Sequence, residues 1–248
     1  MTGVVAANGG HLLVRDVEVG YGSGFNLPAM TFEVAPGEVV GIIGPNGSGK
    51  STLLKGIARV LPLSGGEVLL GGEDIGRVAG RIAYVPQRED VNWDFPATAL
   101  DVVLMGRYRS TGWFRRPDRA SRALAHEALE RLGLGGMGDR HISQFSGGQQ
   151  QRIFLARALV QEPLVLLLDE PFTGIDATNR TLLHELIAEL GRTGVIILMA
   201  THDLDEVTSI CSSVCCLNHR LVAFGPTATT YTPETIRATV GGQIAVFS

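Results

Sequence analysis

The stretch Gly44-Pro45-Asn46-Gly47-Ser48-Gly49-Lys50-Ser51 decides the fold of this 248-residue chain. It has the spacing G-x-x-x-x-G-K-[ST] and lies between an apolar segment predicted as a strand, Glu38–Ile43, and a segment with helical apolar spacing, Ser51–Val60. Glycines let backbone N–H groups turn inward around phosphate oxygens, and the start of a helix adds partial positive charge. This order of strand, loop and helix predicts a phosphate-binding cradle; the alternative is an ordinary glycine-rich turn.

Within this loop, the P-loop, two side chains carry chemistry. Lys50 is expected to reach the terminal phosphates of a nucleotide, and the Ser51 hydroxyl to ligate Mg²⁺. The candidate nucleotide-binding residues are Gly44, Pro45, Asn46, Gly47, Ser48, Gly49, Lys50, Ser51 and Thr52.

A second acidic motif supports this interpretation. The apolar run Leu164–Leu168 predicts a buried strand, and Asp169 and Glu170 follow at its carboxyl end, where ligands of α/β proteins bind. Asp169 is expected to hold Mg²⁺, and Glu170 to polarise the attacking water. The alternative is a core strand that ends in a solvated acidic turn.

Periodicity along the chain predicts an α/β fold. Strands and helices alternate at both ends, whereas the middle, roughly 88–162, is helical, which suggests a parallel-sheet core interrupted by a helical subdomain. The predicted strands are Leu12–Val19, Met30–Val34, Glu38–Ile43, Glu67–Leu70, Arg81–Val85, Leu164–Asp169, Val195–Ala200, Val214–Leu217 and Leu221–Phe224. The predicted helices are Ser51–Val60, Ala97–Met105, Arg119–Leu132, Gly147–Gln161, Ala177–Leu190, Leu204–Ile210 and Pro233–Thr239.

Composition excludes several classes of protein. The net charge of −4 argues against a general nucleic-acid binder, which usually carries a basic excess. No apolar run reaches the 18 residues of a membrane span, and the N-terminus lacks the pattern of a signal peptide. The chain is therefore expected to be soluble and cytosolic.

The three cysteines, Cys211, Cys215 and Cys216, lie within six residues. Adjacent strand residues point to opposite faces, so Cys215 and Cys216 have poor geometry for a shared metal or disulfide. We interpret all three as small buried side chains, with a metal site as the alternative.

A further motif, Phe145-Ser146-Gly147-Gly148-Gln149-Gln150-Gln151-Arg152, resembles the signature of ATP-binding cassette (ABC) transporter ATPases, with Phe145 where leucine is commoner. Two glycines and a serine at a helix start suit a phosphate anion. The resemblance spans about residues 12–225. It implies that Ser146, Gly147, Gly148 and Gln149 of one subunit close over the P-loop of a second copy, with two ATP molecules between them in a head-to-tail dimer.

The resemblance implies roles for four more residues. Gln87 matches the glutamine that senses Mg²⁺ and the attacking water, and His202 matches the histidine that contacts the γ-phosphate. Asp176 matches the acidic residue of the loop at the dimer interface. Tyr21 lies where the family places an aromatic ring on adenine.

Segments 88–96, 101–107 and 112–117 are similar to ATPases of bacterial manganese, zinc and iron importers. The resemblance implies a membrane permease that docks on this surface, and an extracytoplasmic metal-binding protein in the same complex. Trp93 and Phe95 are candidate anchors for the permease, or they plug the joint between core and helical subdomain. The arginines of 107–119 face lipid headgroups or are simply solvated.

The sequence thus predicts a P-loop NTPase (ABC ATPase) core with a mainly parallel sheet, an N-terminal antiparallel β subdomain and an inserted α-helical subdomain. The expected divisions are 1–87 with 163–225 (nucleotide-binding core), 88–162 (helical subdomain) and 226–248 (tail). The expected function is an ATPase, with ATP and Mg²⁺, that drives a divalent-metal importer from the cytoplasmic face of the membrane. Manganese is the favoured metal, with zinc and iron as the alternatives. The alternative is a soluble assembly scaffold, for example in iron–sulfur cluster construction; a nucleic-acid partner is not expected.

Overall fold

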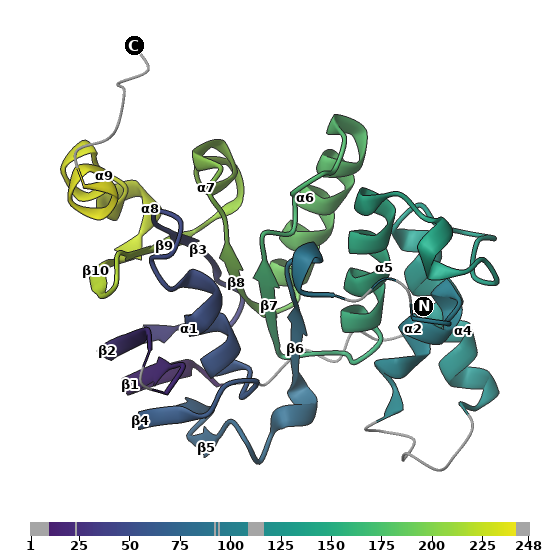
Figure 1. Cartoon of the computed structure of the whole chain (residues 1–248), viewed down its shortest axis with the longest axis horizontal. Helices are drawn as coiled ribbons and strands as arrows, with labels where there is room; N and C mark the ends of the chain where they lie inside the picture. Colours follow the sequence, from purple (N-terminus) through teal and green to yellow (C-terminus); the bar gives the residue numbers. More distant parts are fainter. Residues whose placement is uncertain (1–9, 23, 92, 94, 109–116, 242–248) are drawn as a thin grey trace.

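The computed structural model describes residues 10–22, 24–91, 93, 95–108 and 117–241, and contains two β-sheets with helices around them (Figure 1). The strands are β1 Leu12–Gly20, β2 Asn26–Val34, β3 Val39–Ile43, β4 Leu63–Leu70, β5 Glu73–Asp74, β6 Ile82–Val85, β7 Val165–Asp169, β8 Ile196–Ala200, β9 Ser213–Leu217 and β10 Leu221–Pro226. The α-helices are α1 Lys50–Ile57, α2 Ala99–Met105, α4 Arg119–Arg131, α5 Gly147–Leu159, α6 Ala177–Arg192, α7 Leu204–Ile210, α8 Thr227–Thr230 and α9 Pro233–Val240. Short 3₁₀ helices are η1 Ala79–Arg81, η2 Arg88–Asp90 and η3 Ile142–Gln144.

The larger sheet has the order β10-β9-β3-β8-β7-β6, and only β10 pairs antiparallel to its neighbour. Every residue of β3, β7 and β8 is buried, which explains their continuous apolar sequences, because a parallel sheet is covered on both faces. The carboxyl ends of parallel strands share one edge, so the loops after β3, β6, β7 and β8 meet there.

Alternate residues of β7 belong to the two hydrophobic cores of the molecule. Val165 and Leu167 pack in the core that includes α1 and the smaller sheet. Leu166 and Leu168 pack in the core that includes helices α2, α4, α5 and α6. Figure 1 shows α1 on one side of β6 and β7 and α5 on the other, with α2 and α4 beside α5. This confirms the predicted α/β fold class, with its mainly parallel sheet, antiparallel sheet and helical middle.

The smaller sheet, of order β2-β1-β4-β5, is antiparallel. β4 begins at Leu63 and not at Glu67, and β2 begins at Asn26 and not at Met30, so both predicted starts were too late. In β4, Gly66 interrupts the alternation of apolar and polar residues. Its φ is 72°, and it lies where β1 and β4 change register. A Cβ on Gly66 would lie 2.2 Å from the Asp16 carbonyl oxygen, so glycine permits the strands to approach.

Two predicted helices end earlier than their apolar spacing indicated. α1 stops at Ile57, because Arg59 takes the left-handed conformation with φ of 57°. α5 stops at Leu159, three residues before Glu162, whose φ is 51°. Among the described residues, no helix has both the length and the apolar character to cross a membrane.

Candidate nucleotide-binding site

The P-loop connects β3 to α1, and its glycines are required by geometry. Gly47 and Gly49 have φ of 78° and 106°, a region that residues with a Cβ rarely adopt. A Cβ on Gly44 would lie 1.9 Å from the Leu217 carbonyl oxygen, and one on Gly49 would lie 2.6 Å from Leu27 Cδ2. The loop is therefore pressed against β9 and β2, which leaves its outer side to Asn46 and Gly47, both exposed.

Lys50 places a buried ammonium inside this loop. Its Nζ donates to the carbonyl oxygens of Gly44, at 2.8 Å, and Pro45, at 3.2 Å. Burial lowers the pKa of Lys50, and the carboxylates of Glu170 and Asp169 oppose that shift. No side chain among the described residues caps the start of α1. An ammonium and uncapped backbone N–H groups at a helix start are the chemistry that a phosphate needs.

The remaining polar P-loop candidates are close to Lys50 in the sequence. Ser48 and Thr52 are buried, and Ser51 is half-buried. The Ser48 hydroxyl oxygen has no hydrogen-bond partner in the described part of the chain.

Asp169 ends β7 with its carboxylate between two hydroxyl groups. Ser51 Oγ donates to Oδ1 at 3.0 Å, and the Tyr84 hydroxyl donates to Oδ2 at 3.2 Å. Burial raises the pKa of Asp169, and these two hydrogen bonds partly offset the shift. A carboxylate and a serine hydroxyl are hard oxygen ligands of the type that Mg²⁺ prefers, so the pair fits that ion.

Tyr84 was not among the site residues predicted from the sequence. Its strand was predicted, and β6 pairs with β7 in a register that sets Tyr84 opposite Leu167. A tyrosine near the carboxyl end of a strand beside the acidic strand was the available signal.

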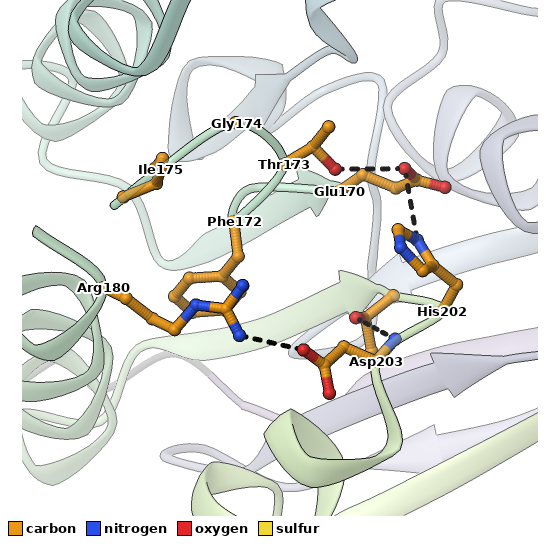
Figure 2. Close-up of a pocket in the computed structure, with 9 residues that line it drawn as sticks. Glu170, Phe172, Thr173, Gly174, Ile175, Arg180, His202 and Asp203 are labelled. Carbon is orange, nitrogen blue, oxygen red and sulfur yellow. Dashed lines mark hydrogen bonds and ion pairs between the residues drawn. The ribbon is translucent and has the colours of Figure 1, made fainter. Parts of the chain in front are cut away.

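Glu170 has a backbone conformation that is unusual for its residue type. Its φ is 50°, and its N–H donates to the Ala200 carbonyl oxygen at 3.0 Å. Left-handed conformations of residues other than glycine are strained and cluster at functional sites. The turn sets the Glu170 carboxylate between Thr173 and His202 (Figure 2).

The Glu170 carboxylate and the two side chains that contact it line a pocket. Thr173 Oγ1 donates to Glu170 Oε2 at 3.2 Å, and His202 Nδ1 lies 3.4 Å from the same oxygen. The side chain of His202 is 63% exposed, whereas that of Glu170 is 19% exposed. The pocket is lined by Glu170, Phe172, Thr173, Gly174, Ile175, Arg180, Thr201, His202 and Asp203. The structure thus brings Glu170 and His202 together. Their predicted roles, water activation and γ-phosphate contact, stay predictions.

Gln87 and Tyr21 take no part in the contacts of the site among the described residues. Gln87 follows β6 and precedes η2, at the same sheet edge as Asp169, and its side chain makes no hydrogen bond within the described residues. Tyr21 is 51% exposed in the turn between β1 and β2. Their predicted roles toward nucleotide stay predictions.

The signature residues begin α5, and Ser146 caps it. Ser146 Oγ accepts from the Gln149 N–H at 3.4 Å, and Gln149 Oε1 accepts from the Ser146 N–H at 2.9 Å. A Cβ on Gly148 would lie 2.8 Å from the Gly174 carbonyl oxygen, so the signature touches the loop after Glu170. Helix α1, which follows the P-loop, and helix α5, which the signature begins, lie on opposite sides of β6 and β7 (Figure 1).

Asp176 caps α6, the helix that follows this loop. Its Oδ1 accepts from the Asn179 N–H at 3.0 Å and its Oδ2 from Asn179 Nδ2 at 2.6 Å. These hydrogen bonds lower the pKa of Asp176. Its predicted contact across a dimer interface stays a prediction.

The two predicted permease anchors differ. Trp93 Nε1 donates to the Arg88 carbonyl oxygen at 2.9 Å, and its ring packs edge-on against Phe154 of α5 at 5.0 Å. Trp93 therefore fits the alternative interpretation, a ring at the joint with the helical segment. Phe95 is 50% exposed, so its ring is accessible to a docking partner and its predicted role as a permease anchor stays a prediction.

Most of the predicted arginine run, including Arg109, Arg115 and Arg116, lies outside the described residues. Arg107 is neither lipid-facing nor merely solvated, because its Nη1 donates to the Val160 carbonyl oxygen at 2.9 Å and to Glu162 Oε2 at 3.2 Å. Of segment 112–117, the structure describes only Pro117.

The cysteines are all buried. Cys215 packs in one core and Cys216 in the other, which confirms that they point to opposite faces of β9. Burial raises the pKa of Cys211 to about 12.

Comparisons with known proteins agree with this geometry. The family model described as ABC transporter matches residues 27–173, more than half of the chain. The zinc transport system ATP-binding protein TroB of Treponema pallidum is 44% identical, over 94% of this chain and 87% of that protein. The manganese transport system ATP-binding protein MntB of Bacillus subtilis is 43% identical, over 92% of each chain.

A solved metal-chelate type ABC transporter in an inward-facing conformation superposes with a TM-score of 0.79 at 28% identity, covering 92% of this chain and 87% of its own. A nucleotide-free ATP-binding cassette has the same TM-score at 25% identity, covering 93% and 98%. With its phosphate cradle, its acidic strand end and its signature helix, the chain belongs to the ABC transporter family, as one of the family's ATPases.

Proposed function

We propose that this chain is the ATP-hydrolysing subunit of a bacterial ABC importer of divalent metal ions. Manganese is the favoured cargo, with zinc and iron as the alternatives. The observation that carries the ATPase proposal is the meeting of Lys50, Asp169 and Glu170 at one sheet edge, with His202 beside Glu170. The cargo rests on the relatives, whose names include zinc, manganese and chelated iron transport systems.

In this proposal the P-loop holds the phosphates of ATP, and Tyr21 stacks on the adenine. The Lys50 ammonium neutralises charge on the terminal phosphates. Ser51 and Asp169, with Gln87, hold Mg²⁺, which shields the negative charge of the phosphate oxygens when it is bound.

Glu170 acts as the general base for the attacking water. Its Oε2 is engaged by Thr173 and His202, so Oε1 is the oxygen that accepts the proton. The water oxygen bonds to the γ-phosphorus, and the bond to the oxygen bridging the β- and γ-phosphorus breaks. The products are ADP and phosphate. His202 is placed beside the base, where it can also contact the γ-phosphate.

The active form is a head-to-tail pair of identical chains. Each chain carries a P-loop before α1 and a signature, Ser146–Gln149, at the start of α5, and these two helices lie on opposite sides of β6 and β7. One nucleotide cannot engage both sites of one chain, so a second copy supplies the second site. Asp176, at the start of α6, is the proposed interface residue.

The pair works at the cytoplasmic face of the membrane as a peripheral subunit. The permease docks near Trp93 and Phe95, of which Phe95 is the exposed side chain, and an extracytoplasmic metal-binding protein completes the complex. We place these contacts in the proposed helical subdomain, 88–162, between the proposed core segments 1–87 and 163–225. No role is proposed for the tail, 226–248, and no nucleic acid is required.

Total metal content of cells tests the transport proposal. Cells that lack this chain are grown under limiting metal supply, complemented with wild type or Glu170→Gln, and analysed by elemental mass spectrometry. A fall in manganese, zinc or iron that wild type restores and Glu170→Gln does not is the expected result, and it also identifies the cargo. Arg131→Gln, a surface change on α4, is the matched control and should restore the metal like wild type. Unchanged metal content in the deleted strain would contradict an importer and favour a soluble scaffold ATPase.

A further inference from the structure

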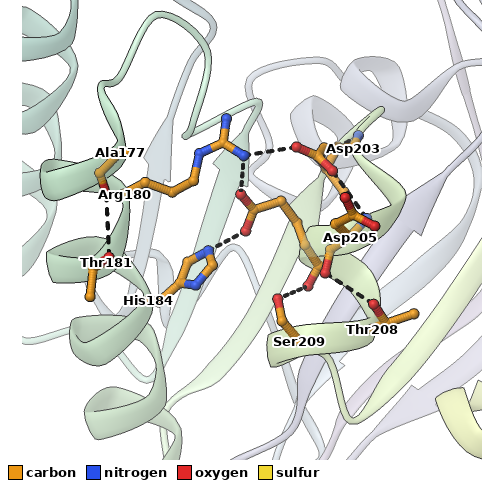
Figure 3. Close-up of polar contacts among 10 residues, drawn as sticks. Ala177, Arg180, Thr181, His184, Asp203, Asp205, Thr208 and Ser209 are labelled. Atoms are coloured by element: carbon orange, nitrogen blue, oxygen red, sulfur yellow. Dashed lines mark hydrogen bonds and ion pairs between the residues drawn. The ribbon is translucent and has the colours of Figure 1, made fainter.

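Glu206, on α7, is a buried carboxylate outside the predicted catalytic set. Its side chain is 1% exposed. Its Oε2 pairs with His184 Nε2, and its Oε1 lies 2.9 Å from Arg180 Nη1 (Figure 3). A buried carboxylate is costly unless it is paired, so Arg180 and His184 are the groups that make this position tolerable.

Arg180 contacts two acidic residues with a single nitrogen. Its Nη1 lies 2.9 Å from Glu206 and donates to Asp203 Oδ2 at 2.8 Å. The guanidinium also lies over the Phe172 ring, 5.9 Å from its centre, and His184 packs edge-on against the same ring at 5.0 Å. We name Arg180, His184, Asp203 and Glu206 the α6–α7 cluster.

The cluster joins the two segments that form the candidate catalytic pocket. Arg180 lies one turn into α6. This helix directly follows the loop 173–176, which comes after Glu170. Asp203 caps α7 and is adjacent to His202 in sequence. Figure 2 shows Arg180 and Asp203 bonded on one side of the pocket, with Glu170 and His202 on the other. The ion pair therefore bridges the segment of the base and the segment of the histidine.

We infer that Arg180 is a positioning residue for ATP hydrolysis, which acts by holding the 170–176 segment and the 202–203 segment in register through Asp203 and Glu206. The inference rests on the proposed ATPase function. The side-chain contacts of Arg180 are with Phe172, Asp203 and Glu206, none of which belongs to the P-loop, so ATP affinity should depend little on it. The distance between Glu170 and His202 should depend on it strongly, and small misplacements of reacting groups are expensive.

The test compares the turnover of Arg180→Gln and Arg180→Lys with that of wild type. Arg180→Gln should lower kcat on the order of tenfold with KM for ATP nearly unchanged. Lysine keeps a charge but not the planar fork, so Arg180→Lys should recover part of kcat. The matched control is Arg131→Gln, which removes another arginine–carboxylate pair that involves α6, between Arg131 of α4 and Glu189 of α6 at 2.9 Å.

A double variant separates positioning from stability. Arg180→Gln removes one of the two groups that pair with the buried Glu206 carboxylate, so Tm should fall. Arg180→Gln/Glu206→Gln removes the buried charge, so Tm should recover while kcat stays low. If kcat recovers together with Tm, the cluster serves stability alone and the inference is overturned.

Hydrogen exchange of the nucleotide-free protein gives a readout that does not need turnover. The Glu170 N–H donates to the Ala200 carbonyl oxygen, the Asp203 N–H to Thr201 Oγ1 and the Asp205 N–H to Asp203 Oδ1. These three N–H groups should exchange faster in Arg180→Gln than in Arg131→Gln. Equal protection in the two variants would overturn the positioning role. Absence of ATPase activity in wild type would instead contradict the proposed function, and the exchange result would stand separately.

Discussion

Asp169 shows the competition between function and stability at a single residue. Its side chain is fully buried at the end of β7, where two hydroxyl groups and no arginine contact it among the described residues. Burial raises its pKa in the folded protein relative to the unfolded chain. The ionised carboxylate therefore lowers the free energy of unfolding at neutral pH, and protonation removes this cost as pH falls through the folded pKa.

Asp169→Asn should abolish ATPase activity and yet raise Tm at neutral pH. Asparagine carries no charge to desolvate, and each kcal/mol regained is worth about 2–4 °C for a chain of this size. The advantage should shrink as pH falls through the folded pKa of Asp169, because the wild-type carboxyl is then neutral as well. Thermal unfolding followed by circular dichroism from pH 7 downward measures this difference.

The control for this prediction is Glu185→Gln, an exposed carboxylate on α6, which should leave Tm unchanged. A Tm of Asp169→Asn below wild type at neutral pH would contradict the prediction, since it would mean that the carboxylate stabilises the fold.

At the scale of elements, the start of α5 and the loop before α6 are in contact through backbone. Gly148 is the residue that allows this contact, because a Cβ there would lie 2.8 Å from the Gly174 carbonyl oxygen. No flexible side chain intervenes, so a larger residue must displace one of the two backbones. The start of the proposed signature helix and the loop that follows the proposed base thus lie directly against each other.

Gly148→Ala should push the 173–175 loop away from α5 and lower kcat on the order of tenfold, with Tm reduced by a few degrees. Steady-state ATPase assays and thermal melts measure both. Gly80→Ala is the matched control, because a Cβ there meets no atom within 4 Å. Full activity of Gly148→Ala would mean that the contact is not needed for hydrolysis.

At the scale of the whole molecule, the position of α5 relative to α1 predicts assembly. Helix α1, after the P-loop, and helix α5, at the signature, lie on opposite sides of β6 and β7 (Figure 1), so we expect ATP to join two chains. Hydrolysis should separate them again, because it detaches the γ-phosphate from the nucleotide that is proposed to lie between the two chains.

Glu170→Gln should therefore form an ATP-dependent dimer, since it keeps the phosphate contacts and lacks the base. Light scattering coupled to gel filtration should give twice the 26.4 kDa mass of one chain with ATP and Mg²⁺, and a single mass without them. Lys50→Ala, which loses the buried ammonium of the P-loop, should stay monomeric under both conditions. A monomeric Glu170→Gln at saturating ATP would contradict the sandwich arrangement.

Local features of the chain determined the elements and most of the candidate site. The P-loop, the buried strand before Asp169 and the cap at Ser146 are contiguous patterns, and each is formed by residues within one turn or one strand of each other. For the same reason, Cys215 and Cys216 could be assigned to opposite faces of β9 from their adjacency alone. The resemblance to ABC ATPases then ordered these separate motifs into one site.

Tertiary structure alone decided which distant residues touch. Tyr84 meets Asp169 because β6 pairs with β7, and Arg180 reaches Glu206 because α6 and α7 follow adjacent parallel strands. The extra length of β4 depends on the close approach of Gly66 to β1, which no periodicity in 63–66 indicates. A sequence pattern reports the neighbours of a residue along the chain, whereas these contacts depend on strand order and register, which arise only when the sheet assembles.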